Sequence, residues 1–311
     1  METLRFRAND IVVSRIAFGA EPLGGYEWGD VDFGEIERAV GMALDLGVNL
    51  FDTADCYGHG ESERRLGRVL ANCRDRAVIA TKFGVRFDGQ NRAYYDNSVD
   101  YIEQALNGSL QRLGTDFIDL YQLHWPDGRT PLDAVFDRLD RLRDSGKIRA
   151  YGVTNVAPEK LYPHAKRPGL ASFSLQYSLA HREHEGAIRR LCGEGLVFLS
   201  WGSLGQGILS GHYDLDHRWP EHDRRHRPQY EHFHGEKLAR NLALVERLRE
   251  VAKLENYPSP SVGALRFILD NLSSSVAIVG IKSCAQIAQN VLASERPMTS
   301  ESLARLTMAV P

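Results

Sequence analysis

Four side chains with complementary proton chemistry follow three apolar segments of the chain. Asp52 and Tyr57 both stand in NLFDTADCYG, Lys82 stands in IATKFG, and His124 follows LYQL. A free phenol has a pKa of about 10, so at neutral pH it is a poor acid and a poor base. A neighbouring ammonium favours the phenolate, so we expect Lys82 to lower the pKa of Tyr57, and a carboxylate beside the lysine keeps it charged and fixed.

This set of residues points to proton transfer at a carbonyl or alcohol oxygen. Tyr57 would give a proton to a developing alkoxide, or take one from an alcohol. His124 would donate a hydrogen bond to the same oxygen. The set contains no metal-ligand pattern and no obvious nucleophile. Because no side chain supplies hydride and a nicotinamide cofactor does, the residues indicate a redox reaction with that cofactor.

The elements that would position these residues alternate along the chain. Strand-like apolar segments are followed by segments with the i, i+3, i+4 spacing of a helix, as in Val40, Ala43 and Leu44. Eight such units in 311 residues predict a (β/α)8 TIM barrel. The expected strands are 15–18, 49–52, 78–81, 117–123, 148–153, 173–175, 197–200 and 276–279, and the expected helices are 33–46, 62–70, 99–113, 132–144, 159–165, 185–192, 236–255 and one that begins near Cys284.

A doubly wound open sheet is the structural alternative to the barrel. Such a sheet usually carries G-x-G-x-x-G after its first strand, whereas the first expected strand here leads into FGAEPLGG. Catalytic groups of a barrel come from the carboxyl ends of its strands. Seven successive expected strands end in polar or aromatic residues, so the same mouth would collect them. That convergence favours an active site more strongly than any one of these residues does.

The charge and composition of the chain argue against several classes of protein. A net charge of −3 gives no broad attraction to nucleic acid or to an anionic membrane. The apolar runs are shorter than the roughly 18 residues that suggest a membrane span, and the N-terminus lacks the apolar region of a signal peptide. The four cysteines form no C-x-x-C pair, so we expect no disulfide framework. We therefore predict one cytoplasmic domain over residues 1–311.

One polar segment departs from the alternation. Residues 211–235 hold six of the eleven histidines and follow the seventh expected strand. The spacing of these histidines is irregular and no cysteine lies among them, which is a weak pattern for zinc. We predict no metal site, and we interpret the segment as a long mobile loop over the barrel mouth.

In their order and spacing, several motifs resemble the aldo-keto reductase superfamily over nearly the whole chain. NLFDTADCYGHGESERRLGRVL is similar to that family's first signature, and GKIRAYGVTN, LQYSL, SLGQGILSGHY and IVGIKSCAQIAQN follow in order. The resemblance implies a (β/α)8 barrel that binds NADPH, or sometimes NADH, across its mouth without a Rossmann fold. It also implies that Asp52, Tyr57, Lys82 and His124 form the catalytic tetrad, with Tyr57 as the proton donor.

The resemblance further implies which residues hold the coenzyme. Asn155 and Gln176 would bind the nicotinamide carboxamide, and Trp201 would stack on the nicotinamide ring. A cation near a 2′-phosphate favours NADPH over NADH, and Lys282 stands where such a cation would be. The full implied set is Gly19, Ala20, Thr154, Asn155, Gln176, Trp201, Gly202, Ser203, Leu204, Gly205, Gln206, Gly207, Gly280, Lys282, Gln286, Gln289 and Asn290.

Several positions depart from the family's usual pattern. His212 stands where a lysine is common, which removes a charge near the pyrophosphate or makes that contact pH-dependent, and Gln289 stands where a glutamate is common. Glu21 replaces a bulky apolar or aromatic residue, and it is either a surface charge or a contact for hydroxyl-rich or amino-bearing molecules. Trp28 and Trp125 are further candidates for lining the substrate pocket.

These observations predict an NADPH-dependent enzyme that reduces an aldehyde or ketone, a sugar-like or small natural-product carbonyl, to an alcohol. The same tetrad run in reverse would make an NAD(P)+-dependent sugar or alcohol dehydrogenase. Some members of the superfamily are cofactor-binding regulatory subunits of ion channels, which the tetrad alone does not exclude. The sequence does not identify the substrate, the physiological direction or the oligomeric state.

Overall fold

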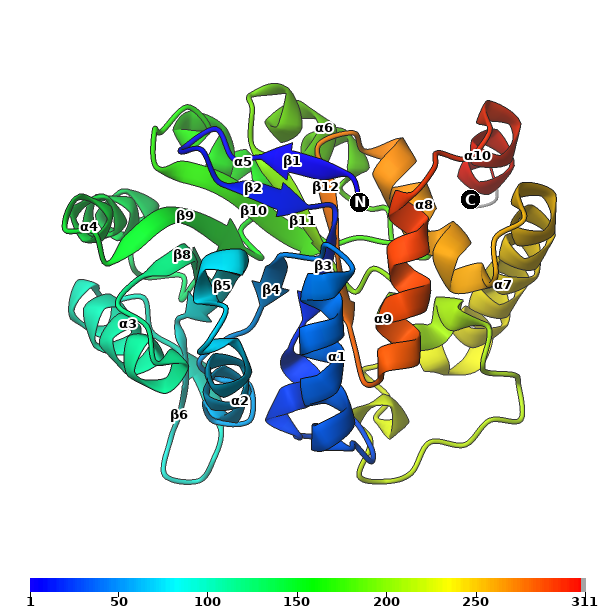
Figure 1. The fold of residues 1–311 in the computed structure, drawn as a ribbon, viewed down its shortest axis with the longest axis horizontal. Coiled ribbons are helices and arrows are strands. Elements are labelled where there is room, and N and C mark those ends of the chain that lie inside the picture. Colours follow the sequence, from blue (N-terminus) through cyan, green and yellow to red (C-terminus); the bar gives the residue numbers. More distant parts are fainter. Residues whose placement is uncertain (309–311) are drawn as a thin grey trace.

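The computed structural model describes residues 1–308, and within them eight parallel strands close into a barrel (Figure 1). The (β/α)8 barrel predicted from the sequence is confirmed, and each expected strand overlaps one barrel strand. The strands follow one another around the barrel as β3 (Ile16–Gly19), β4 (Leu50–Asp52), β5 (Val78–Phe83), β8 (Ile118–Leu123), β9 (Ile148–Thr154), β10 (Leu170–Gln176), β11 (Val197–Trp201) and β12 (Ser275–Gly280), which pairs with β3.

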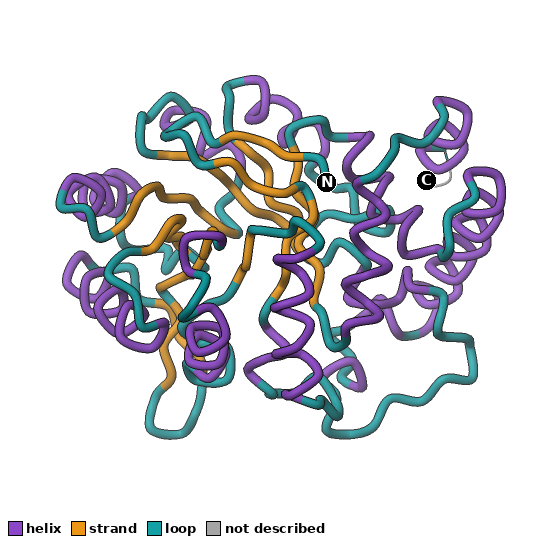
Figure 2. The backbone as a smooth tube through the Cα atoms, viewed as in Figure 1, coloured by secondary structure: helices purple, strands orange, loops and turns teal. Residues whose placement is uncertain are grey.

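Helices surround the barrel, purple around the orange strands in Figure 2. Helix α1 shows the pattern expected of a surface helix. In α1, the Asp32 side chain accepts a hydrogen bond from the Glu35 N–H at the helix start, and the buried residues recur on one face. The helices are α1 (Phe33–Asp45), α2 (Glu61–Leu70), α3 (Val99–Leu113), α4 (Leu132–Asp144), α5 (Pro158–Leu161), α6 (Glu185–Gly193), α7 (Gly235–Glu255), α8 (Pro260–Asn271), α9 (Cys284–Asn290) and α10 (Ser300–Thr307).

Two hairpins and two helices, α8 and α10, were missed by the sequence analysis. An N-terminal hairpin, β1 (Thr3–Arg5) and β2 (Val12–Ser14), packs on the inner barrel residues through an apolar cluster. A second hairpin, β6 (Val85–Phe87) and β7 (Ala93–Tyr95), lies at the opposite end of the barrel (Figure 1). Ser259 caps the start of helix α8, and its side chain accepts a hydrogen bond from the Val262 N–H. A serine followed by proline is a helix-start signal that the sequence did contain.

The expected helix over 159–165 is shorter than predicted. Helix α5 ends at Leu161, and Tyr162–His164 form a 3-10 turn. Pro163 has no backbone N–H to donate, so it does not extend the helical hydrogen-bond ladder there.

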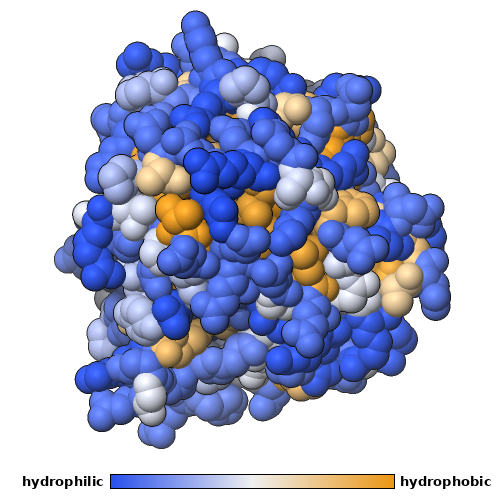
Figure 3. Space-filling model, turned by 90° about the vertical axis from the view of Figure 1, so that its left-hand side faces the viewer, coloured by the Kyte–Doolittle hydropathy of each residue, from blue (hydrophilic) through white to orange (hydrophobic). Residues whose placement is uncertain are grey.

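The surface is predominantly polar. The face in Figure 3 is mostly hydrophilic, with smaller hydrophobic areas between the polar side chains. Among residues 1–308, none of the helices has both the length and the apolar character that a membrane crossing requires.

Two loops at the barrel mouth touch through glycine backbones. A 3-10 turn, Glu21–Gly24, follows β3 and packs against the turn that carries Tyr57 and Gly58. Gly58 has a φ of +58°, and a Cβ added to it would lie 2.2 Å from the Gly24 carbonyl oxygen. No side chain fits in that gap, so the position of Tyr57 depends on this contact.

We predict that Gly58→Ala will lower the free energy of unfolding by about 2–4 kcal/mol. The estimate adds the cost of a left-handed alanine to the cost of the steric clash. Gly114→Ala is the matched control, because Gly114 has a φ of +63° and no atom within 4 Å of an added Cβ; it should cost only about 1 kcal/mol. Urea unfolding measures both, and equal losses would contradict the close packing of the two loops.

Candidate active site

The ends of three neighbouring strands bring the four expected catalytic residues together. Lys82 Nζ donates to Asp52 Oδ2 at 2.7 Å and lies 3.5 Å from the hydroxyl of Tyr57. The Tyr57 and His124 rings meet edge to face, with 5.8 Å between their centroids. Lys82, Asp52 and His124 are each less than 10% exposed, whereas Tyr57 is half-buried. The cluster is therefore a buried charge pair with a phenol and an imidazole beside it.

The barrel register produces this arrangement. Asp52 pairs with Ala80 across β4 and β5, and Lys82 pairs with Gln122 across β5 and β8. The His124 N–H donates to the Phe83 carbonyl at 2.9 Å, immediately beyond the last paired residues. Because parallel strands end at one edge of the sheet, these side chains meet at the mouth.

The expected lowering of the Tyr57 pKa is wrong. Burial raises the pKa of Tyr57 well above its ordinary value, and the carboxylates of Glu21 and Asp52 add to the effect. Lys82 already donates to Asp52 and, at 2.8 Å, to the Thr53 carbonyl, so its charge is largely satisfied elsewhere. The phenol therefore keeps its proton at neutral pH, the state that a proton donor requires.

His124 is a neutral imidazole at this site. Burial, with a contribution from Lys82, lowers the pKa of His124 well below its ordinary value. Its Nδ1 lies 3.6 Å from Cys56 Sγ, and burial raises the pKa of the Cys56 thiol. A protonated thiol can donate to Nδ1, which leaves the ring hydrogen on Nε2 for a substrate oxygen. The raised pKa also disfavours the reactive thiolate.

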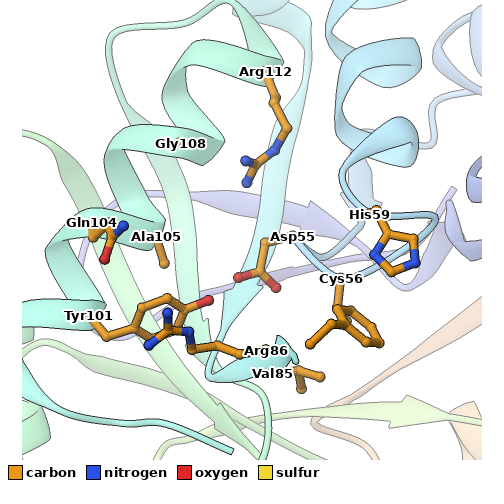
Figure 4. A pocket seen from close by; sticks show the side chains of 11 residues that line it. Asp55, Cys56, His59, Val85, Arg86, Tyr101, Gln104, Ala105, Gly108 and Arg112 are labelled. Carbon is orange, nitrogen blue, oxygen red and sulfur yellow. The ribbon is translucent and has the colours of Figure 1, made fainter. Parts of the chain in front are cut away.

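A side cavity of about 510 Å³ lies behind the loop that carries Cys56. Its lining comes from Asp55, Cys56 and His59, from β6 and from α3 (Figure 4). Figure 4 places the Asp55 carboxylate between Tyr101 and Arg112. Burial raises the pKa of Asp55 to about 8, and the nearby Glu63 carboxylate acts in the same direction. Asp55 therefore lines this cavity together with residues of α3.

One of the expected carboxamide contacts, Asn155, is hydrogen-bonded to the tetrad residue His124. The Asn155 side-chain amide donates to the His124 carbonyl at 3.1 Å and accepts from Trp201 Nε1 at 3.1 Å. These bonds fix the indole of Trp201 and leave one Asn155 amide hydrogen for a ligand. Thr154 Oγ1 is buried and, among residues 1–308, has no hydrogen-bond partner. A polar ligand at the mouth would satisfy both groups, which fits the coenzyme.

The expected pyrophosphate loop, residues 202–207, has an unusual backbone. Gly202, Gly205, Gln206 and Gly207 all have positive φ angles, and the Ser203 hydroxyl donates to the Ser200 carbonyl at 3.0 Å. Successive left-handed residues turn backbone N–H groups toward one side, which makes a concave site for an anion. The implied loop, which also contains Leu204, therefore has a conformation suited to phosphate.

The expected adenosine-end residues lie around the start of α9. The Lys282 N–H donates to Gln286 Oε1 at 2.7 Å, and Ser283 caps the helix. The Lys282 ammonium donates to the Trp28 carbonyl, and burial lowers the pKa of Lys282. Of the remaining implied residues, Gln289 and Asn290 end α9, Gly19 pairs with Gly280, and the Ala20 N–H donates to the Asp52 carbonyl.

The three candidate substrate residues have different surroundings. Glu21 Oε1 forms an ion pair with Arg224 at 2.8 Å, so it is not a free surface charge. Trp28 lies under Arg224, with 4.7 Å from the guanidinium carbon to the ring centroid. Trp125 stacks on Tyr95 of β7, with 5.9 Å between the ring centroids. Arg224 was missed by the sequence analysis, because no local pattern pairs it with a residue 203 positions away.

The 211–235 loop crosses to the loop after β3. It is the long teal segment at the lower right of Figure 2. Besides the Arg224 ion pair, Asp223 forms a β-bridge with Trp28, and Arg225 donates to Asp223. Movement of the predicted mobile loop would have to break the Arg224–Glu21 pair and the Asp223–Trp28 bridge. Within the described residues, no cluster of three or more histidine, cysteine or acidic side chains is arranged to hold a metal ion.

Comparisons with known proteins agree with this geometry. The model of the Aldo/keto reductase family matches residues 15–310. The Aldo-keto reductase YhdN of Bacillus subtilis is 32% identical over 92% of this chain and 87% of its own length. The NADH-specific methylglyoxal reductase of Escherichia coli is 28% identical over 94% and 93%. The solved glycerol dehydrogenase AKR11B4 from Gluconobacter oxydans superposes with a TM-score of 0.89, at 31% identity over 99% and 94%.

We predict that Lys82→Met will lower the free energy of unfolding by about 3–5 kcal/mol, because it leaves the Asp52 carboxyl without its partner in a buried position, where burial already raises its pKa. The double variant Asp52→Leu/Lys82→Met should recover most of that loss, since it removes both charges. Lys237→Met is the matched control, because Lys237 pairs with Glu231 at the surface; it should cost less than about 1 kcal/mol. Denaturant unfolding measures all three, and a fully stable Lys82→Met protein would contradict the buried pair.

Proposed function

Because the chain belongs to the aldo/keto reductase family of NAD(P)H-dependent oxidoreductases, we propose that it reduces an aldehyde or ketone to an alcohol. Tyr57 donates the proton, and the nicotinamide coenzyme supplies the hydride when it is bound. The observation that carries the proposal is the half-buried phenol of Tyr57, which is 3.5 Å from the Lys82 ammonium and packed against a neutral His124.

Each of the four side chains has a different role in the reaction at the carbonyl oxygen. His124 donates a hydrogen bond that orients and polarises the carbonyl, and Tyr57 passes its proton to the oxygen as negative charge develops there. The phenolate that remains lies beside Lys82, whose ammonium stabilises it. Asp52 holds Lys82 in place. In this assignment Lys82 acts after the proton has moved, which is consistent with a phenol that starts protonated.

Members of this family use NADPH or NADH. We propose NADPH for this chain, with NADH as the alternative. Residues 202–207 would bind the pyrophosphate through their N–H groups, and Asn155 and Gln176 would bind the carboxamide. Lys282 supports NADPH because its ammonium, next to Trp28, would supply a cation at the adenosine end of the site.

We propose a small, hydroxyl-bearing carbonyl as the substrate. The Glu21–Arg224 pair is a hydrogen-bond acceptor next to a donor, and its charges are close enough to influence the pKa of Tyr57. Adjacent hydroxyl groups can bond to both members of such a pair. Trp125, stacked on Tyr95, would supply an apolar wall.

The reverse reaction, oxidation of an alcohol by NAD(P)+, is the second candidate. It is supported by the name of the similar solved structure, a glycerol dehydrogenase. The same residues serve both directions, but the raised pKa of Tyr57 favours the protonated phenol and hence reduction.

Tyr57→Phe tests the role of the phenol. It should lower the rate of carbonyl reduction by about 100-fold or more, because the proton donor is lost. Coenzyme affinity, measured by quenching of protein fluorescence, should be nearly unchanged. Tyr257→Phe is the control, since Tyr257 lies between α7 and α8, and it should leave the rate intact. A Tyr57→Phe protein with the wild-type rate would exclude this tyrosine as the donor.

A further inference from the structure

A histidine of the 211–235 loop contacts one of the expected carboxamide ligands. His232 lies in a 3-10 turn, Glu231–Phe233, and is only 8% exposed. Its Nε2 is 3.3 Å from the side-chain amide nitrogen of Gln176, at the end of β10. The proposed mechanism gives no role to this buried histidine. The contact joins the loop directly to the nicotinamide end of the site.

Asn241 of α7 decides which ring nitrogen of His232 carries the hydrogen. The Asn241 side-chain nitrogen donates to the His232 carbonyl at 3.0 Å and lies 3.2 Å from His232 Nδ1. A backbone carbonyl can only accept, so the Asn241 NH2 group must face His232. His232 Nδ1 then accepts the second amide hydrogen. The ring is neutral, because burial and nearby positive charge lower the pKa of His232 to about 4, so its hydrogen is on Nε2.

The His232 N–H in turn decides how the Gln176 amide is oriented. An Nε2–H group needs an acceptor, and the only acceptor on the Gln176 side chain is Oε1. A half-turn of the terminal amide exchanges its oxygen and nitrogen, and the hydrogen-bond network selects between the two orientations. The network here selects the orientation in which Oε1, in exchange for the amide nitrogen, lies against His232, and the NH2 group of Gln176 is left to donate elsewhere.

We propose that His232 is a positioning residue that orients Gln176, so that the Gln176 NH2 group donates to the carboxamide oxygen of the nicotinamide. This inference rests on the proposed function, in which Gln176 binds the carboxamide. Asn241 fixes which ring nitrogen of His232 carries the hydrogen, and His232 fixes the orientation of the Gln176 side-chain amide. The 211–235 loop thereby completes the coenzyme site without touching the reacting atoms.

A coenzyme analogue distinguishes the two amide orientations. Thionicotinamide NADP+ replaces the carboxamide oxygen by sulfur, a weaker acceptor, and keeps the NH2 group. An NH2 group of Gln176 fixed toward that position should favour NADP+ over the analogue by about fivefold, the effect of one hydrogen bond. In His232→Ala the amide is free to turn and accept from the carboxamide NH2 of either coenzyme, so the ratio of the two Kd values should fall toward one.

The two Kd values are measured by fluorescence quenching on the wild type and on three variants. His232→Gln keeps an amide N–H that can donate to Gln176, so it should recover part of the discrimination. His226→Ala is the matched control, because His226 is an exposed histidine of the same loop, and it should leave the wild-type ratio. In the wild-type protein, 15N NMR of the histidine rings should show His232 protonated at Nε2 only, which does not depend on any variant folding.

Two results would overturn the inference and leave the proposed function standing. One is a wild-type ratio that is unchanged in His232→Ala, and the other is a His232 ring protonated at Nδ1. A wild-type protein that binds neither coenzyme would instead contradict the proposed function itself, and the inference with it.

Discussion

The buried ion pair between Asp52 and Lys82 is the constraint on which the site depends. Two charges removed from water are stable only when each is paired and hydrogen-bonded in good geometry. Here that geometry comes from the barrel, because β4 and β5 end side by side and Lys82 reaches both Asp52 and the Thr53 carbonyl. The pair also leaves the Lys82 ammonium 3.5 Å from the Tyr57 hydroxyl. A structural requirement of the fold and a chemical requirement of proton transfer are thus met by the same lysine.

Loops as well as strand ends contribute residues to the candidate site. Gly24 and Gly58 allow the loop after β3 to pack against the turn that holds Tyr57, which brings Glu21 close enough to raise the pKa of that tyrosine. The 211–235 loop supplies Arg224 against Glu21 and His232 against Gln176. The proposed proton donor, substrate mouth and coenzyme site are consequently linked through side chains that lie far apart in the sequence.

The sequence was sufficient to predict the barrel and the meeting of Asp52, Lys82 and His124, because alternating apolar patterns and strand ends are local signals. It was not sufficient to predict the direction in which the pKa of Tyr57 is shifted. That value depends on burial and on Glu21, and neither can be read from the residues around Tyr57. The partners of Glu21 and Trp28 were missed for the same reason, since the loop residues that contact them come from another part of the chain. Helix α8 was different, because its Ser-Pro start was present in the sequence and was overlooked.

The most direct test of the central claim is a single-turnover experiment on the wild-type protein. The protein is loaded with NADPH, or in parallel with NADH, and the loss of nicotinamide absorbance is followed after mixing with aldehydes, ketones and keto-sugars. The proposed function predicts rapid oxidation of the bound coenzyme by at least one hydroxyl-bearing carbonyl, faster with NADPH than with NADH. Tight coenzyme binding with no oxidation by any carbonyl, and no reduction of NADP+ by the corresponding alcohols, would contradict it.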